Sequence, residues 1–412
     1  MADSFDIVII GAGAAGLAAA QRLASEPLAV ALLEARDRVG GRAHTIEAGG
    51  LPLDAGCEWL HSADRNPLVP LIEAHGFAVE RSTAHWQRRT DRLGISPADA
   101  EAFGQAWSDL DARLEAAAAT GVDAPAADFL EPGGRWNGLL NAGSGYYNGA
   151  AWDEVSVLDY AAYQDSGRNW RVREGYGAAI AALGGPVAAR LGCAVAEIDH
   201  SGGAIRIVTA KGTLTARAVI VTAPSNVLAS EAIRFSPSLP DKVAAAAGLP
   251  LGDANKAWLA VSEPQRLPAE GHCFGRTDTA ATAGYFLRPF GRPCVEAYFG
   301  GALARDLEGE GPGALTAFAI DELAGVLGSD MRRLLSPLIE TTWSGDPFSL
   351  GAYSHALPGH AGDRAVLAAP VDGRIFFAGE ATHPSYFSTA HGAWESGGRA
   401  AGEAIAALKG RA

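Results

Sequence analysis

The sequence is poor in cysteine and has no long apolar run. Its 412 residues include 4 cysteines (Cys57, Cys193, Cys273 and Cys294), and no two of them form a CxxC pair or a spacing with histidine that would bind a metal. Neither a disulfide framework nor a metal site is therefore indicated, and a reducing compartment is expected. No apolar run reaches the roughly 18 residues that a membrane-spanning helix needs. These absences favour a soluble, cytoplasmic protein with no membrane partner and no metal.

Positive charge is also scarce. The chain has 33 Lys and Arg residues against 47 Asp and Glu, a net charge of −14, which argues against general binding to nucleic acid or anionic membranes. An acidic surface attracts polycations, but many cytoplasmic proteins are acidic, so this carries little weight. The first apolar segment begins within a few residues of Met1, so no secretory signal is expected ahead of it. The length suits two domains with sizeable cores.

Glycine is abundant, and one cluster of glycines has a specific context. The apolar residues 7–10 predict a buried strand, and residues 17–23 predict an Ala-rich helix. Between them lies the sequence Gly11-Ala12-Gly13-Ala14-Ala15-Gly16. Bare backbone N–H groups at a helix N-terminus bind a diphosphate, and Gly16 lets helix and strand pack closely. A simple tight turn is the alternative, because a lone GxGxxG is weak evidence.

A strand is predicted at residues 30–33, and Glu34 follows it directly. This acid favours interpreting the glycine turn as part of a dinucleotide-binding site. A carboxylate at this distance from the turn accepts hydrogen bonds from ribose hydroxyls and disfavours the 2′-phosphate of NADP. The segment that follows has a glycine pair between arginines, suited to a second close approach to the pyrophosphate. Its residues are Ala35, Arg36, Gly40, Gly41 and Arg42. Spacing alone leaves NAD and FAD open.

This run resembles the flavin-containing amine oxidases, whose FAD sites carry E-A-x-x-R-x-G-G-R. The resemblance implies FAD. A second run, Gly56-Cys57-Glu58-Trp59-Leu60-His61 followed by Asn66-Pro67-Leu68, is similar to G-A-x-W-x-H and N-P-L of the polyamine oxidases. By that match the run contacts the cofactor and His61 faces the substrate. Without the resemblance, His61 reads as a surface residue that caps the next helix.

Further motifs of the same family follow in order. Lys256 lies in a G-x-x-N-K motif, and in the family this lysine holds a water at flavin N5, although sequence alone suggests only a solvated lysine. Trp343 and Tyr353 match W-x-x-D-P and G-x-Y-S. By resemblance, the backbone of Val195 holds adenine and the strand ending at Ala223 passes close to the FAD.

The terminal block is similar to G-E-A-T-H and S-T-x-H-G-A-x-x-S-G of polyamine and spermine oxidases. It contains Gly379, Glu380, Thr389 and Ala390. Helix N–H groups at Thr389 would stabilise negative charge that develops on a reduced flavin. Monoamine oxidases place two aromatic rings before the flavin, whereas here Tyr353 supplies one and Thr389 stands in place of the other. This departure argues against a simple arylalkylamine substrate. No cysteine lies near Tyr353, so the flavin is expected to be non-covalent.

The central region predicts helices and loops. Ser96 and Pro97 signal a helix start, with the helix running to residues 114–120. Residues 133–148 look like an aromatic-rich loop, and residues 178–191 like a helix. Asp153, Glu154, Asp159 and Asp165 are acids that could receive a distal ammonium group, although most are expected to be solvated.

Together these motifs predict a Rossmann-like α/β FAD-binding domain interleaved with an α+β substrate-binding domain, a mixed sheet flanked by helices. The FAD domain is assigned to residues 1–78, 172–239 and 345–412, and the substrate domain to residues 79–171 and 240–344. The predicted function is FAD-dependent oxidation of a C–N bond in a polyamine or a related secondary or primary amine, with O2 as acceptor and H2O2 as product. Lys256, Tyr353, His61 and Thr389 are the candidate catalytic residues, in a monomer or homodimer. The alternatives are oxidation or desaturation of an amino acid or cyclic amine, or a non-catalytic flavoprotein.

Overall fold

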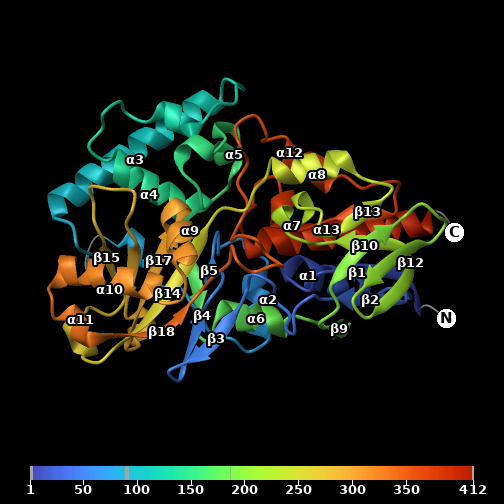
Figure 1. Cartoon of the computed structure of the whole chain (residues 1–412), viewed down its shortest axis with the longest axis horizontal. Helices are drawn as coiled ribbons and strands as arrows, with labels where there is room; N and C mark the ends of the chain where they lie inside the picture. The colour runs from blue at the N-terminus through green and yellow to red at the C-terminus, as the bar shows by residue number, and fades with distance from the viewer. Residues whose placement is uncertain (1–2, 89–91, 186, 411–412) are drawn as a thin grey trace.

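The computed structural model describes residues 3–88, 92–185 and 187–410, and its strands form two large sheets (Figure 1). Eight described strands form the first sheet, in the order β13-β10-β11-β12-β1-β2-β9, with β19 paired to the end of β12. They are β1 (Asp3–Ile10), β2 (Val30–Leu33), β9 (Ala189–Arg190), β10 (Val195–Asp199), β11 (Ile205–Thr209), β12 (Gly212–Val221), β13 (Arg234–Ser236) and β19 (Ile375–Phe377). Neighbouring strands pair in parallel from β12 through β1 and β2 to β9, and β19 also pairs in parallel with β12. On the other side of β12, strand β11 is antiparallel both to β12 and to β10.

Both faces of this sheet are covered, which explains why residues 7–10 of β1 are all apolar. Ile7 and Ile9 pack against α1 (Ala14–Leu23) and α13 (Ala390–Lys409), and Val8 and Ile10 belong to the core on the other face. That second core includes residues of α7 (Ser225–Ala229), α8 (Pro240–Ala247) and α12 (Asp363–Ala368). Helices α1 and α13 lie side by side (Figure 1). They approach so closely that a Cβ at Gly397 would lie 2.0 Å from the Ala15 carbonyl oxygen.

The second sheet contains six described strands in the order β18-β14-β17-β16-β15-β7. They are β7 (Arg92–Leu93), β14 (Ala254–Val261), β15 (Gly271–Phe274), β16 (Gly284–Leu287), β17 (Cys294–Gly300) and β18 (Leu335–Glu340). Ala257, Leu259 and Phe299 belong to a core shared with α9 (Gly301–Glu310), α10 (Ala314–Leu327) and α11 (Met331–Leu334). Lys256 pairs with Tyr298 across the sheet, so alternation places both on the opposite face.

A helical layer covers that end of the molecule. Helix α3 (Pro97–Ala118) begins as predicted, with the Ser96 hydroxyl accepting from Asp99 N at 3.1 Å. Helices α4 (Asn137–Asn148) and α5 (Val157–Ala162) complete a core around Trp152. The loop predicted at residues 133–148 is therefore wrong over α4. Its glycines serve packing, since a Cβ at Gly143 would lie 2.3 Å from the Trp107 ring.

Smaller elements connect these layers. They are β3 (Thr45–Ala48), β4 (Leu51–Asp54), β5 (Trp59–Leu60), β6 (Val79–Glu80), β8 (Trp170–Val172), α2 (Leu68–Ala74), α6 (Tyr176–Ala182) and the 3₁₀ turns η1 (His85–Gln87), η2 (Ala126–Phe129), η3 (Trp152–Glu154), η4 (Pro264–Arg266), η5 (Pro289–Gly291) and η6 (Glu380–Thr382). Helix α6 is shorter than the helix predicted at 178–191, because Gly184 and Gly185 follow it and Gly185 has φ +63°.

The chain crosses between the two sheets more than once. Strands β1, β2, β9 to β13 and β19 belong to the first sheet, and β7 and β14 to β18 to the second. This confirms the predicted fold class, while the domain boundaries stay a prediction. Over the three described ranges, the helices are all too short or too polar to cross a bilayer.

Candidate active site

A cavity of about 1400 Å³ runs between the two sheets. Every residue predicted to be catalytic or to bind the cofactor lines it except Gly16: Gly11, Gly13, Ala14, Ala15, Glu34, Ala35, Arg36, Gly40, Gly41, Arg42, Gly56, Cys57, Glu58, Trp59, His61, Val195, Ala223, Lys256, Trp343, Tyr353, Gly379, Glu380, Thr389 and Ala390. Gly16 has the predicted packing role, because its Cβ would lie 1.8 Å from the Gly11 carbonyl oxygen.

The first sheet's end of the cavity is built from bare backbone. Gly11 has φ +99°, and a Cβ there would lie 2.5 Å from the Thr222 hydroxyl. The two glycine turns abut, since Gly40 N donates to Ala12 O at 2.8 Å and a Cβ at Gly41 would lie 3.1 Å from the Gly13 Cα. The first turn of α1 contains no acidic side chain, so its N–H dipoles face the cavity unopposed. Such a cradle fits the diphosphate of a dinucleotide.

Glu34 stands where the ribose of such a dinucleotide is expected. It is buried, and its carboxylate accepts from Ala12 N at 2.8 Å and from Arg36 N at 2.9 Å. These bonds fix the carboxylate beside the turn and leave each oxygen a second lone pair for a hydroxyl donor. Val195 at the start of β10 and Ala223 after β12 line the same end.

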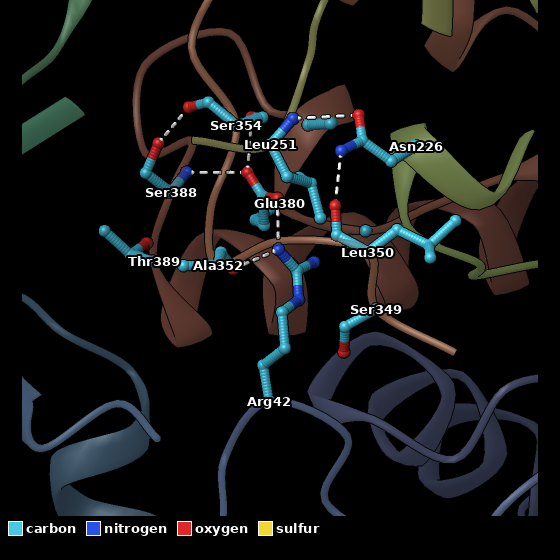
Figure 2. A network of polar contacts seen from close by, with 12 residues as sticks. Arg42, Asn226, Leu251, Ser349, Leu350, Ala352, Ser354, Glu380, Ser388 and Thr389 are labelled. Atoms are coloured by element: carbon cyan, nitrogen blue, oxygen red, sulfur yellow. Dashed lines mark hydrogen bonds and ion pairs between the residues drawn. The ribbon is translucent and has the colours of Figure 1, made fainter. Parts of the chain in front are cut away.

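The predicted arginines are anchored to the C-terminal part of the chain. Arg36 donates to Asp346 Oδ1 at 2.7 Å and to Ser349 at 2.8 Å. Arg42 donates to Ala352 O at 2.7 Å and to Glu380 Oε1 at 2.9 Å (Figure 2).

Glu380 is the centre of this network (Figure 2). Its Oε2 accepts from the Ser354 hydroxyl at 2.6 Å and from Ser388 N at 2.8 Å. Burial acts to raise its pKa, but the charge of Arg42 and the hydrogen bond from Ser354 outweigh it and lower the pKa. An ionised Glu380 therefore joins the arginine turn to the segment that leads into α13.

Lys256 lies at the middle of the cavity and is buried. Its Nζ lies 2.9 Å from Glu58 Oε2 and 3.0 Å from Glu296 Oε1. Burial disfavours the ammonium, but the two carboxyl groups more than compensate and raise the pKa of Lys256. The sequence alone predicted a solvated lysine, and that alternative is wrong because the facing strand and the Glu58 loop enclose it. Trp343 lines the cavity too, with Nε1 donating to Ala55 O at 3.0 Å.

Tyr353 belongs to a chain of hydroxyl groups. It donates to Tyr146 O at 2.7 Å, so Tyr298, 2.9 Å away, donates to it. Burial raises the pKa of Tyr353 well above its ordinary value. Thr389 caps α13, accepting from Gly392 N at 3.0 Å and donating to Tyr386 O at 2.6 Å. Both residues line the cavity, and α13 points its N-terminus into it.

His61 lies half-buried in the cavity wall and does not cap a helix. Its Nδ1 lies 2.7 Å from Asn169 Oδ1, a carbonyl acceptor, so Nδ1 carries the proton and the neutral ring keeps its lone pair at Nε2. Burial lowers the pKa of His61. The ring can therefore accept a proton or a hydrogen bond.

The side formed by α3, α4 and α5 is acidic and aromatic. Asp165 lines it, but Asp153 and Glu154 are exposed elsewhere, and Asp159 is buried against Arg364 at 2.6 Å. The lining also contains residues that the sequence analysis did not single out, among them Asp111, Glu115, Glu296 and Tyr298. Glu296 could have been identified from the sequence, because it is the single acid in the otherwise apolar segment 294–300. The acids of α3 gave no such signal, because their pattern is that of an ordinary solvated helix face.

Comparisons with known proteins agree with this geometry. The model of the family described as flavin containing amine oxidoreductase matches residues 14–124 and 115–405. Probable polyamine oxidase 4 of Arabidopsis thaliana is 30% identical over 95% of this chain and 85% of its own length. Polyamine oxidase 3 of Oryza sativa subsp. japonica is 29% identical over 96% and 88%. The cyclohexylamine oxidase of Brevibacterium oxydans shares the fold, with a TM-score of 0.81 at 21% identity over 98% of this chain and 99% of that one. The chain belongs to the flavin-containing amine oxidoreductase family.

Proposed function

We propose that this protein oxidises an amine with at least two nitrogens, of the polyamine class, using non-covalently bound FAD and O2. Its relatives named polyamine oxidase support the class. The diphosphate cradle and Glu34 at the ribose position support FAD as the flavin.

The distribution of charge in the cavity carries the proposal. Asp111, Glu115 and Asp165 line the side opposite the nucleotide cradle. Tyr147, which is 57% exposed, lines the same cavity and lies in the field of Asp165 and Asp111. Carboxylates among aromatic rings bind an ammonium group by charge and by cation–π contact.

A clamp for a substrate carboxylate has less support. Arg171, Arg173 and Arg288 lie outside the described cavity lining and have other partners. Arg171 pairs with Glu270, Arg173 pairs with Glu80, and Arg288 donates to Leu267 O. Arg92 does line the cavity, but its guanidinium donates to the carbonyl oxygens of Arg88 and Trp86. A cationic substrate is therefore favoured over an amino acid.

The reaction assigns a task to each side chain. Hydride leaves the carbon beside nitrogen only when that nitrogen has a free lone pair, so the ammonium must first lose its proton. The Nε2 of His61 is the acceptor available for it. Tyr353 and Thr389 flank the reacting amine, and Lys256 holds a water at the middle of the cavity. When bound, the flavin supplies the two-electron acceptor.

The state of Cys57, one of the two cysteines among the described cavity lining, supports non-covalent binding. Cys57 lines the cavity, and burial raises the pKa of its thiol to about 12. A protonated thiol is a poor nucleophile, so it does not form a thioether. Acid precipitation of the purified protein should release FAD into the supernatant, and flavin retained in the pellet would contradict this.

Anaerobic spectra of the yellow protein test the function. Spermine, N-acetylated spermine, spermidine, putrescine and a phenylethylamine are added one at a time. Bleaching by a polyamine, with Asp111→Asn and Asp165→Asn each raising KM by roughly tenfold or more, is expected from losing a charged hydrogen bond. Asp109→Asn, on the exposed face of the same helix, is the matched control. Bleaching by the phenylethylamine alone would refute the substrate class, and bleaching by none of the five amines would refute amine oxidation.

A cytoplasmic location and a monomeric or dimeric state are further proposals. The four cysteines are all free, which suits a reducing compartment. Cell fractionation and light scattering test the two, and a periplasmic or higher-order species would contradict them.

A further inference from the structure

Lys256 is bracketed by two carboxyl groups, so the cluster contains one cation and two acids. Glu58 and Glu296 each lie within 3.0 Å of Nζ, and the three side chains are only 5 to 6% exposed. One positive charge balances one carboxylate. A second carboxylate would leave a net charge in a buried site, which is strongly unfavourable.

The contacts of Glu296 indicate which acid stays neutral. Glu58 and Glu296 are held against the same ammonium, with Glu58 Oε2 at 2.9 Å and Glu296 Oε1 at 3.0 Å from Lys256 Nζ, so a proton on one of the two carboxyl groups removes their mutual repulsion. Oε2 of Glu296 is buried and has no hydrogen-bond donor facing it among the described residues. A proton on Glu296 satisfies both conditions. The pKa shifts agree with this assignment. Burial and the charge of Glu58 raise the pKa of Glu296 well above its ordinary value. Burial also acts to raise the pKa of Glu58, but the charge of Lys256 outweighs burial and lowers it.

The surrounding groups do not change this balance. Two arginines, one acid and several weakly acidic or neutral groups face the cluster from neighbouring elements: Asp54, Cys57, His85, Arg171, Arg292, Cys294 and Tyr298. The arginines favour ionised Glu58, and the thiols and phenol are neutral because burial raises the pKa of each. The cluster is thus a neutral unit with one mobile proton, lining the cavity.

We propose that Glu296 carries this proton in the resting protein and, acting through Lys256, supplies it when oxygen is reduced. The step rests on the proposed function. Reduction of O2 to H2O2 takes two electrons and two protons, and the hydride removed from carbon accounts for two electrons and one proton. The second proton comes from Lys256 as an N–H bond breaks and a peroxide O–H bond forms. Glu296 then reprotonates Lys256, and the proton that His61 accepted from the substrate ammonium passes on to restore Glu296. The site neither gains nor loses charge over the cycle.

Infrared spectroscopy of the oxidised, flavin-loaded protein in D2O tests the resting proton without turnover. A carboxylic acid C=O band should be present in the wild type and lost in Glu296→Gln. It should also be lost in Glu58→Gln, where Glu296 remains but becomes the main carboxylate partner of Lys256 and ionises. Glu80→Gln is the control, because Glu80 is ionised and contributes no carboxylic acid band. Burial acts to raise the pKa of Glu80, but its hydrogen bond from Ser82 and its pairing with Arg173 lower it. A band that survives in Glu296→Gln overturns the proposal.

Reoxidation tests the delivery. Flavin reduced chemically under nitrogen is mixed with O2, so the assay does not depend on which amine is the substrate. Glu296→Gln should slow reoxidation roughly 100-fold, the usual loss for a missing general acid, and Glu296→Asp should recover most of it. The wild-type rate should fall at high pH and show a solvent isotope effect that Glu296→Gln lacks. Reoxidation of Glu296→Gln at the wild-type rate overturns the proposal that Glu296 delivers the proton. This result is separate from a refutation of the proposed function, which would show as a flavin that no amine bleaches.

Discussion

Replacing the adjacent glycines Gly397 and Gly398 of α13 by alanine should change the stability of the protein in opposite directions. A Cβ at Gly397 would lie 2.0 Å from Ala15 O and 2.7 Å from its carbonyl carbon, whereas one at Gly398 meets nothing within 4 Å. Relief at Gly397 requires α1 and α13 to separate by about an ångström, an overpacking that costs roughly 1–3 kcal/mol or more. Gly398→Ala should stabilise the helix by about 0.5–1 kcal/mol, because alanine loses less backbone entropy.

The same displacement should affect cofactor binding. Both helices point their N-termini into the cavity, with Ala14 and Ala15 of α1 and Ala390 of α13 among its lining. Gly397→Ala should therefore lower both the urea midpoint and the flavin-to-protein ratio, while Gly398→Ala keeps full flavin. Urea unfolding followed by tryptophan fluorescence and flavin absorbance measures both quantities. Equal effects of the two substitutions, or full stability and flavin in Gly397→Ala, would refute the close packing of these helices.

Three further outcomes follow from the site. Lys256→Met should slow flavin reduction or reoxidation at least tenfold while FAD stays bound, and unchanged stopped-flow rates would remove the lysine from the chemistry. Glu380→Ala should cost about 3–5 kcal/mol, because it strands the Arg42 charge and the Ser354 and Ser388 donors. Arg42→Met should cost less, roughly 1–3 kcal/mol, since Glu380 keeps two donors; the reverse order in urea would be inconsistent with Figure 2. Burial lowers the pKa of His355 to about 4, so its proton uptake on unfolding makes stability rise with pH from about 4 to about 6.5. His355→Gln should flatten that rise, measured as urea midpoints at each pH.

Local chemistry explains which elements the sequence predicted well. Strand β1, helix α1 and the Glu34 position follow from apolar runs, glycine turns and spacing, and the Ser96-Pro97 start defines α3. These signals act within a few residues. Helix α4 was missed because glycine normally disfavours helices, and only the Trp107 ring and the β17 backbone explain Gly143 and Gly145.

Residues brought together by long-range packing were harder to predict. Lys256 and Glu58 are 198 positions apart, and the sequence shows each as an isolated charge. Glu296 faces Lys256 only because β17 pairs with β14 in a particular register. The acids Asp111 and Glu115 of α3 line the cavity, whereas Asp153 and Glu154, which lie closer in sequence to the predicted aromatic-rich loop, do not. The predicted roles of individual residues stay predictions until variants are measured.

The arrangement of charge along the cavity explains why a substrate with two nitrogens suits the site. Backbone dipoles and arginines lie at the nucleotide end, the Lys256 cluster at the middle is neutral overall, and Asp111, Glu115 and Asp165 lie on the opposite side. A carboxylate near the reacting nitrogen would stabilise its ammonium form and oppose hydride release. With the middle neutral and the acids farther along, one nitrogen stays charged and anchored while the other can lose its proton to His61. A monoamine gains no such anchor, so its affinity should not depend on Asp111 and Asp165, and that difference separates the two substrate classes.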